Sequence, residues 1–161
     1  MTNDLQHRVS KLLEKYRARN LRIATAESCT GGLVAGLLTS IAGSSDVVEC
    51  GFVTYSNESK ISMLGIPSQI IQRHGAVSRE CAIAMVEGAL KHSSADIAVS
   101  VTGIAGPGGG SAEKPVGLVH FACGQQDNIK HRVEQFGDIG REQIRTAATE
   151  VALELLESQL P

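Results

Sequence analysis

Hydrophobic and polar positions follow two different periods along the chain, and each period predicts a different kind of element. Apolar residues recur every three or four positions over residues 3–19 and 140–158, which predicts two amphipathic helices. Short apolar runs, rich in β-branched residues over 47–55, instead predict buried strands. The expected helices cover residues 3–19, 31–41, 56–64, 67–75, 79–92 and 140–158, and the expected strands cover 21–26, 47–55, 96–102, 116–123 and 129–135.

The order of these elements predicts the fold class. Strands alternate with helices, and a hairpin across residues 124–128 then precedes the last helix. This order predicts an α/β fold, a three-layer α/β/α sandwich around a mixed, mostly parallel sheet of about five strands. Ser56 is expected to cap the helix after it, and Pro67 to be the first residue of the next. With no internal repeat or low-complexity linker, residues 1–161 are expected to form a single domain.

Composition narrows the possible partners and the cellular compartment. A net charge of −2 gives no general attraction to nucleic acid or membranes, and 3% aromatic residues argue against a base-stacking surface. No apolar run approaches the roughly 18 residues of a membrane span. The N-terminus lacks the features of a signal peptide, and the four scattered cysteines form no C-x-x-C pair. We therefore expect a reduced cytoplasmic protein with no metal site, cofactor or disulfide.

Glycine is the most informative residue type, because seven of the 17 glycines lie in two short segments that each follow a predicted strand. The segments are residues 26–32 (AESCTGG) and 102–110 (TGIAGPGGG). Open α/β sheets bind ligands beyond the carboxyl ends of their strands. In the first segment, free amides at a helix start could form an anion or oxyanion site, or Ser28 or Thr30 could simply cap the helix. The second segment fits neither a dinucleotide nor a P-loop pattern, and either presents amides to a phosphate or is a flexible connection.

A third segment, residues 54–60 (TYSNESK), follows the second predicted strand. Tyr55 and Lys60 are both proton-transfer groups, five residues apart across a strand-to-helix turn. The structural alternative has Tyr55 covering the core and Lys60 on a solvated helix face. The residues of this segment alone leave both interpretations open.

The chain resembles the CinA C-terminal domain family in five segments that occur in the family's order and span nearly the whole chain. They are ATAESCTGG (24–32), GFVTYSNESK (51–60), GAVS (75–78), AVSVTGIAGPGGG (98–110) and KPVGLVHFA (114–122). The motifs ESCTGG and TGIAGPGGG are highly specific in combination. The chain is most similar to the stand-alone members, which are nicotinamide-nucleotide amidohydrolases. The resemblance therefore implies metal-free hydrolysis of nicotinamide mononucleotide (NMN) to nicotinate mononucleotide and ammonia, by a bacterial homo-oligomer.

The resemblance also assigns roles to particular residues. Ser28 would be the nucleophile, with Tyr55 and Lys60 as its proton-transfer partners, and no His–Asp signature surrounds the serine. Apart from the resemblance, the position of residues 29–32 at a helix start makes their amides the expected oxyanion hole, and adjacency to Ser28 makes the Cys29 thiol a rival nucleophile. The family's Gly-Asp-Arg is interrupted here over residues 137–141 (GDIGR), so two arginines are candidates. The expected substrate-binding residues are Cys29, Thr30, Gly31, Gly32, Thr102, Gly103, Gly106, Gly108, Gly109, Arg141 and Arg145.

This mechanism requires Lys60 to be neutral, because only a neutral amine can accept a proton near pH 7. The pKa of lysine must then fall by about 3 from its ordinary value near 10.4, which corresponds to about 4 kcal/mol. Burial or a nearby cation must supply most of this shift, and Glu58 would oppose it if close. The alternative function is a non-catalytic CinA-like module that binds a nucleotide or a partner, linked to competence or the DNA-damage response. Such a module would tolerate loss of Ser28, Tyr55 and Lys60, so their joint presence favours the enzyme.

Overall fold

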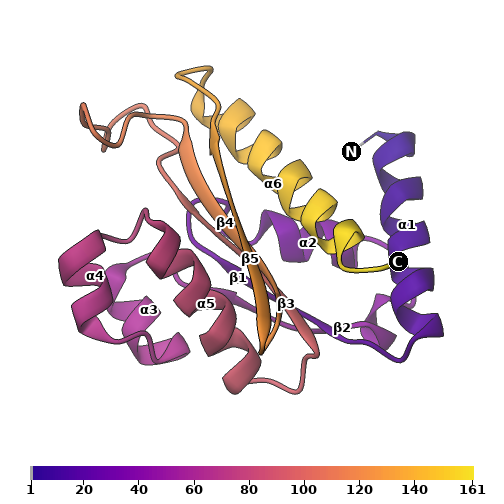
Figure 1. The fold of residues 1–161 in the computed structure, drawn as a ribbon. Coiled ribbons are helices and arrows are strands. Elements are labelled where there is room, and N and C mark those ends of the chain that lie inside the picture. The colour runs from indigo at the N-terminus through magenta and orange to yellow at the C-terminus, as the bar shows by residue number, and fades with distance from the viewer. Residues whose placement is uncertain (1) are drawn as a thin grey trace.

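The computed structural model describes residues 2–161, and its elements follow the predicted order (Figure 1). The helices are α1 (Asn3–Ala18), α2 (Leu33–Thr39), α3 (Asn57–Leu64), α4 (Ser68–His74), α5 (Arg79–Lys91) and α6 (Arg141–Ser158), with a 3-10 turn η1 (Ser44–Asp46). The strands are β1 (Ile23–Glu27), β2 (Val48–Val53), β3 (Ile97–Gly103), β4 (Leu118–Gln125) and β5 (Asn128–Gln135). Within residues 2–161, no helix combines the length and the apolar character that crossing a membrane requires.

The strands form one mixed sheet in the order β2-β1-β3-β4-β5. Strand β1 pairs in parallel with β2 and β3, whereas β4 is antiparallel to both β3 and β5. Only β4 therefore runs against the others, which confirms the mixed, mostly parallel sheet. The register of β4 and β5 pairs Gln125 with Asn128, so the predicted hairpin closes through a two-residue turn.

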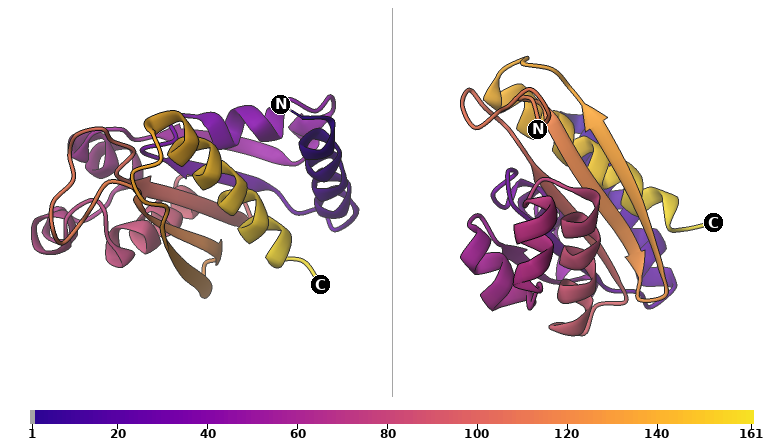
Figure 2. Two further views of the ribbon diagram at one scale, coloured as in Figure 1. Left: turned by 90° about the horizontal axis from the view of Figure 1, so that it is seen from above. Right: turned by 60° about the vertical axis from the view of Figure 1, so that its left-hand side comes forward.

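Helices cover both faces of the sheet, as Figure 2 shows, with α1, α2 and α6 on one face and α3, α4 and α5 on the other. The side chains of β1 alternate between these layers: Ile23 belongs to the core under α1, α2 and α6, and Ala24 to the core under α5. The Tyr16 hydroxyl donates to the Leu156 carbonyl at 2.8 Å and joins α1 to α6. These two buried layers confirm the predicted three-layer sandwich.

Local capping chemistry explains where three of the helices begin. Ser56 and Ser59 form a reciprocal capping box at the start of α3, so the predicted cap is confirmed. Ser78 caps α5 by accepting a hydrogen bond from the Cys81 amide. Pro67 precedes α4 as its N-cap and not as its first residue, because its ψ of 129° is extended, not helical.

Helix α2 begins at Leu33, two residues later than predicted. Gly31 and Gly32 have φ values of +59° and +104°, and a right-handed helix cannot include such residues. Neither Ser28 nor Thr30 caps the helix, so that expectation is wrong; the N-cap is Gly32, which has no side chain to contribute. The cap comes instead from a carboxylate on β1.

Candidate active site

The three segments singled out in the sequence meet at one edge of the sheet. Residues 28–32, 54–56 and 104–117 follow β1, β2 and β3, which are adjacent and parallel, so their carboxyl ends lie together. The connection from β1 to β2 passes through α2 on one face, and that from β2 to β3 passes through α3, α4 and α5 on the other (Figure 1). Ligands of open α/β sheets bind at such a point.

Ser28 and Lys60 are in direct contact at this edge. The Lys60 Nζ lies 2.9 Å from the Ser28 Oγ and donates to the Thr54 carbonyl at 2.8 Å. Lys60 is 1% exposed and Ser28 is 8% exposed, although both are polar. Lys60 is therefore not on a solvated helix face, and the fold brings it onto a serine that lies 32 positions earlier.

The surroundings of Lys60 favour its neutral form. Burial lowers the pKa of the amine, and no carboxylate of residues 2–161 forms an ion pair with it. The nearby thiols of Cys29 and Cys81 would favour the ammonium form only if ionised, but burial raises the pKa of each to about 11. Glu58 lies on the exposed face of α3. Burial therefore shifts Lys60 toward the state in which a lone pair on Nζ can accept the Ser28 proton.

The other two reactive side chains expected at the site, those of Cys29 and Tyr55, lie in the core and at the surface. The Cys29 side chain is 5% exposed and packs in the core under α6, so its thiol stays protonated near pH 7. Tyr55 is 58% exposed, and within residues 2–161 its hydroxyl bonds to Arg141 Nη2 at 2.6 Å and not to Ser28 or Lys60. Of the two candidate nucleophiles, only Ser28 lies against a base.

The sequence analysis missed Glu27, whose carboxylate is 1% exposed. Its Oε1 accepts from the Thr30 hydroxyl at 2.7 Å and the Val34 amide at 2.9 Å, and its Oε2 accepts from the Ala35 amide at 3.0 Å. The first amides of α2 are thus already bound to a carboxylate of the protein, so the helix start is not an open anion site. The available signal was an acidic residue that ends an otherwise uncharged strand.

The loop between β1 and α2 leaves part of the predicted oxyanion hole free. The Gly31 amide donates to the Ser28 carbonyl, which removes it from the set. Arg145 donates to the carbonyls of Cys29 and Thr30, at 3.0 and 3.1 Å. Because C=O and N–H point in opposite directions in a trans peptide, the Thr30 amide points away from Arg145. In the described part of the chain, the amides of Cys29, Thr30 and Gly32 meet no backbone acceptor.

The second glycine-rich segment contains residues of two kinds. Gly106 accepts from Arg141 Nη1 at 2.8 Å, and a Cβ on Gly106 would lie 2.6 Å from Val116. The Thr102 hydroxyl is occupied by the Ala76 carbonyl at 2.8 Å, and a Cβ on Gly103 would clash with β4. Thr102, Gly103 and Gly106 are thus packed against their neighbours, whereas residues 107–110 are exposed.

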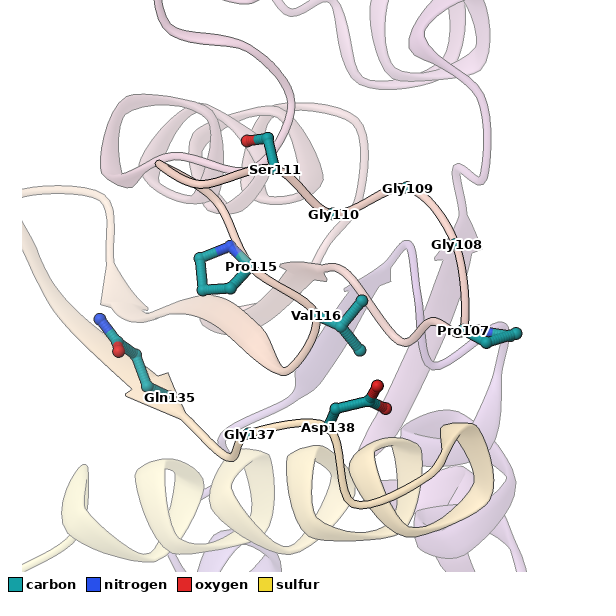
Figure 3. A pocket seen from close by; sticks show the side chains of 10 residues that line it. All are labelled: Pro107, Gly108, Gly109, Gly110, Ser111, Pro115, Val116, Gln135, Gly137 and Asp138. Carbon is teal, nitrogen blue, oxygen red and sulfur yellow. The ribbon is translucent and has the colours of Figure 1, made fainter.

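Two hollows flank the contact between Arg141 and Gly106, and they differ in charge. The first, of about 560 Å³, is lined by Pro107, Gly108, Gly109, Gly110, Ser111, Pro115, Val116, Gln135, Gly137 and Asp138. Figure 3 shows the Asp138 carboxylate pointing into it. The second, of about 530 Å³, is lined by Leu33, Arg141, Glu142, Arg145 and Thr146. Ser28 lines neither hollow, and no group of three or more His, Cys, Asp or Glu side chains within residues 2–161 could hold a metal ion.

Comparison with known proteins gives consistent matches over the whole chain. The CinA C-terminal domain model matches residues 3–160. A CinA-like protein of Synechococcus sp. is 49% identical over 94% of this chain, but the chain spans only 36% of that protein, about a third of its length. The nicotinamide-nucleotide amidohydrolase PncC of Escherichia coli is 49% identical, over 91% of this chain and 88% of PncC. A crystal structure of the competence/damage inducible protein CihA from Agrobacterium tumefaciens superposes with a TM-score of 0.95 at 51% identity, covering 98% of this chain and 96% of CihA.

Proposed function

The chain belongs to the CinA C-terminal domain family, and from this membership and its site we propose that it hydrolyses the carboxamide of NMN. The products would be nicotinate mononucleotide and ammonia, as in pyridine nucleotide salvage. The observation that carries the proposal is the buried contact of 2.9 Å between Lys60 Nζ and Ser28 Oγ. It is supported by the relative PncC, whose name states this activity and of which the alignment covers 88%.

The first half of the proposed reaction forms an acyl-enzyme. Neutral Lys60 takes the Ser28 proton while the serine oxygen attacks the carboxamide carbon, and a tetrahedral oxyanion forms. When the intermediate collapses, the carbon–nitrogen bond breaks and the Lys60 ammonium returns its proton to the leaving nitrogen. Ammonia departs, and the nicotinoyl group remains as an ester on Ser28.

The second half releases the acid. A water molecule gives a proton to Lys60 and attacks the ester carbon. Collapse of this second oxyanion breaks the bond to the serine oxygen, which takes the proton back from Lys60. In both halves the amides of Cys29 and Thr30 are the proposed donors to the oxyanion, and one such donor contributes roughly 3 kcal/mol in comparable sites.

The charges of the two hollows support an orientation for the nucleotide. A phosphate carries up to two negative charges and binds best to guanidinium groups. The second hollow has two of them, from Arg141 and Arg145, against one carboxylate from Glu142. The Asp138 carboxylate in the first hollow would repel a phosphate but accepts hydrogen bonds from hydroxyl groups, such as those of a ribose. Tyr55 enters this proposal through Arg141, whose guanidinium it contacts at the mouth of the site.

The first prediction is that the purified protein releases equimolar ammonia and nicotinate mononucleotide from NMN in the presence of EDTA. Ser28→Ala should lower kcat by roughly 10⁴-fold or more because it removes the nucleophile. Cys29→Ala is the matched control and should stay within a few-fold of the wild type, since its thiol is buried. Full activity in Ser28→Ala would refute the mechanism, and NMN binding without any product would support the non-catalytic module. Sedimentation of the same sample measures whether the protein is the expected homo-oligomer.

A further inference from the structure

We propose that Glu27 is the positioning residue of the nucleophile, an inference that rests on the proposed function of Ser28. The two residues are consecutive, but their side chains point to opposite faces of the sheet. The Glu27 carboxylate reaches α2, whereas the Ser28 hydroxyl reaches Lys60 on α3. Glu27 therefore touches none of the reacting atoms and acts on them through the chain.

The side chain of Glu27 fixes the turn that carries Ser28. Its three accepted hydrogen bonds tie the end of β1 to Thr30, Val34 and Ala35, which spans the whole turn after the nucleophile. Two of the three donors are backbone amides, so they set the path of the chain and not only the position of a side chain. Because Ser28 lies between these anchored points, its Oγ is held in one place relative to Lys60.

The backbone of Glu27 also orders the base. Its carbonyl accepts from the Thr54 amide at 2.8 Å, and the Thr54 carbonyl accepts from Lys60 Nζ at 2.8 Å. One residue is thus connected to both members of the pair, by its side chain to the serine turn and by its main chain to the lysine. Substitution of the side chain separates these two connections, since the backbone bond remains.

The chemistry of the three contacts requires a carboxylate. Every partner of the Glu27 side chain is a donor, and an ionised carboxyl group has only acceptors. In Glu27→Gln, the amide NH₂ would face at least one backbone N–H, and that buried pair of donors would push the turn apart. A displacement of about 1 Å at a nucleophile can cost roughly 100-fold in rate.

The test uses phenylmethylsulfonyl fluoride, which reports on Ser28 without NMN. The serine oxygen forms a bond to sulfur, the sulfur–fluorine bond breaks, and fluoride leaves while Lys60 takes the serine proton. Intact-mass measurements give the labelling rate, with Ser28→Ala as the unlabelled reference. We expect Glu27→Gln to be labelled roughly 100-fold more slowly than the wild type, and to lose kcat for NMN by a similar factor with KM within about threefold.

Two further comparisons separate positioning from general stability. Thr25→Val is the matched control, because Thr25 lies on the same face of β1, is fully buried and has a hydroxyl with no hydrogen-bond partner among residues 2–161. It should be labelled within about twofold of the wild-type rate. Thr30→Val removes one of the three contacts and should slow labelling about tenfold, whereas Thr30→Ser keeps the hydroxyl and should recover most of that loss.

The outcomes are distinct. Wild-type labelling in a folded Glu27→Gln protein overturns the inference, as does an equal slowing in Thr25→Val. If Glu27→Gln does not fold, the Thr30 pair decides: equal rates for Thr30→Val and Thr30→Ser overturn the inference, and a recovery in Thr30→Ser supports it. If Ser28 is labelled with the expected dependence on Glu27 but NMN is not hydrolysed, the proposed substrate fails while the positioning role stands.

Discussion

The two glycine-rich segments at the edge of the sheet have similar compositions but are held in different ways. Residues 28–32 are held by side chains from three elements: Glu27 at the end of β1, Lys60 of α3 and Arg145 of α6. Residues 104–117 extend away from the sheet in Figure 1, and Arg141 of α6 donates a side-chain hydrogen bond to Gly106 of this segment. The first segment positions the proposed nucleophile, and the second segment forms part of the lining of the first hollow.

The glycines themselves serve different purposes in the two segments. Gly31 has a φ of +59° that turns the chain toward α2. Gly106 and Gly110 allow close contact with Val116, where a Cβ would lie within 3.0 Å of that side chain. Within residues 2–161, no atom lies within 4 Å of the Cβ position of Gly108, and its φ is not positive. A glycine count therefore locates the site but does not reveal which glycines are needed.

Among the substitutions that contrast the two segments, Lys60→Met should have the largest effect, because it removes the contact to Ser28 and leaves residues 104–117 unchanged. Removal of a general base should lower kcat for NMN by roughly 10³-fold. In the wild type, kcat should rise with pH through the lowered pKa of Lys60, because only the neutral amine accepts the serine proton. A pH–rate profile measures this, and an unchanged kcat in the variant would contradict the assignment.

The same variant gives a stability readout with a definite sign. Because the pKa of Lys60 is lower in the folded protein, the unfolded chain binds the extra proton at pH values between the folded and the ordinary value. The free energy of unfolding of the wild type should therefore rise with pH across that interval. The increase should be complete above about pH 10.4. Urea unfolding of Lys60→Met should lack this contribution, and identical pH slopes in the two proteins would rule it out.

The next prediction compares the two arginines. Arg145 donates to the first segment through two nitrogens, so Arg145→Lys should lower kcat by roughly tenfold because an ammonium cannot reproduce the forked contact, in addition to any rise in KM from its proposed contact with the phosphate. Arg141→Lys should instead raise KM for NMN by a similar factor, because Arg141 reaches the second segment and Tyr55. Steady-state kinetics separate the two effects. If both variants changed kcat alone, the proposed roles of Arg145 at the nucleophile segment and of Arg141 in substrate binding would be wrong.

The smallest effects should come from glycine-to-alanine substitutions, which each add a single methyl group. Gly31→Ala should lower the free energy of unfolding by about 1–2 kcal/mol, because the left-handed conformation is unfavourable for alanine and its Cβ would lie 3.3 Å from Arg145. Gly108→Ala should leave stability unchanged or raise it by up to about 1 kcal/mol. Thermal or urea unfolding measures both. Equal losses would show that the second segment is as constrained as the first.

The sequence predicted the fold well, because its hydrophobic periods and capping residues are local signals. Ser56 begins α3 as expected, and the strands follow the apolar runs within a few residues. The start of α2 was harder to predict, because the helix begins at Leu33 only as a result of the backbone conformation of Gly31 and Gly32. The role of Glu27 depended on that boundary, because its carboxylate binds amides seven and eight positions ahead.

The site was predictable only in part from the residues themselves. The pairing of Ser28 with Lys60 depends on how α3 packs against β1, which no local pattern contains, so it came from the family resemblance. Tyr55 and Lys60 are close in sequence, but the capped turn between them sends Lys60 inward and leaves Tyr55 exposed. The charge difference between the two hollows depends on Asp138, Arg141 and Arg145, which come together only when α6 docks on the sheet.

The alternation of Glu27 and Ser28 across the sheet has a consequence for how this chain can change in evolution. A one-residue insertion or deletion within β1 would exchange the two faces and direct a carboxylate at Lys60 and a hydroxyl at α2. Length changes at Gly108 would meet no such obstacle, because that position faces open space. Variation in length should therefore accumulate in the wall of the hollow and be excluded from the strand that ends at the nucleophile.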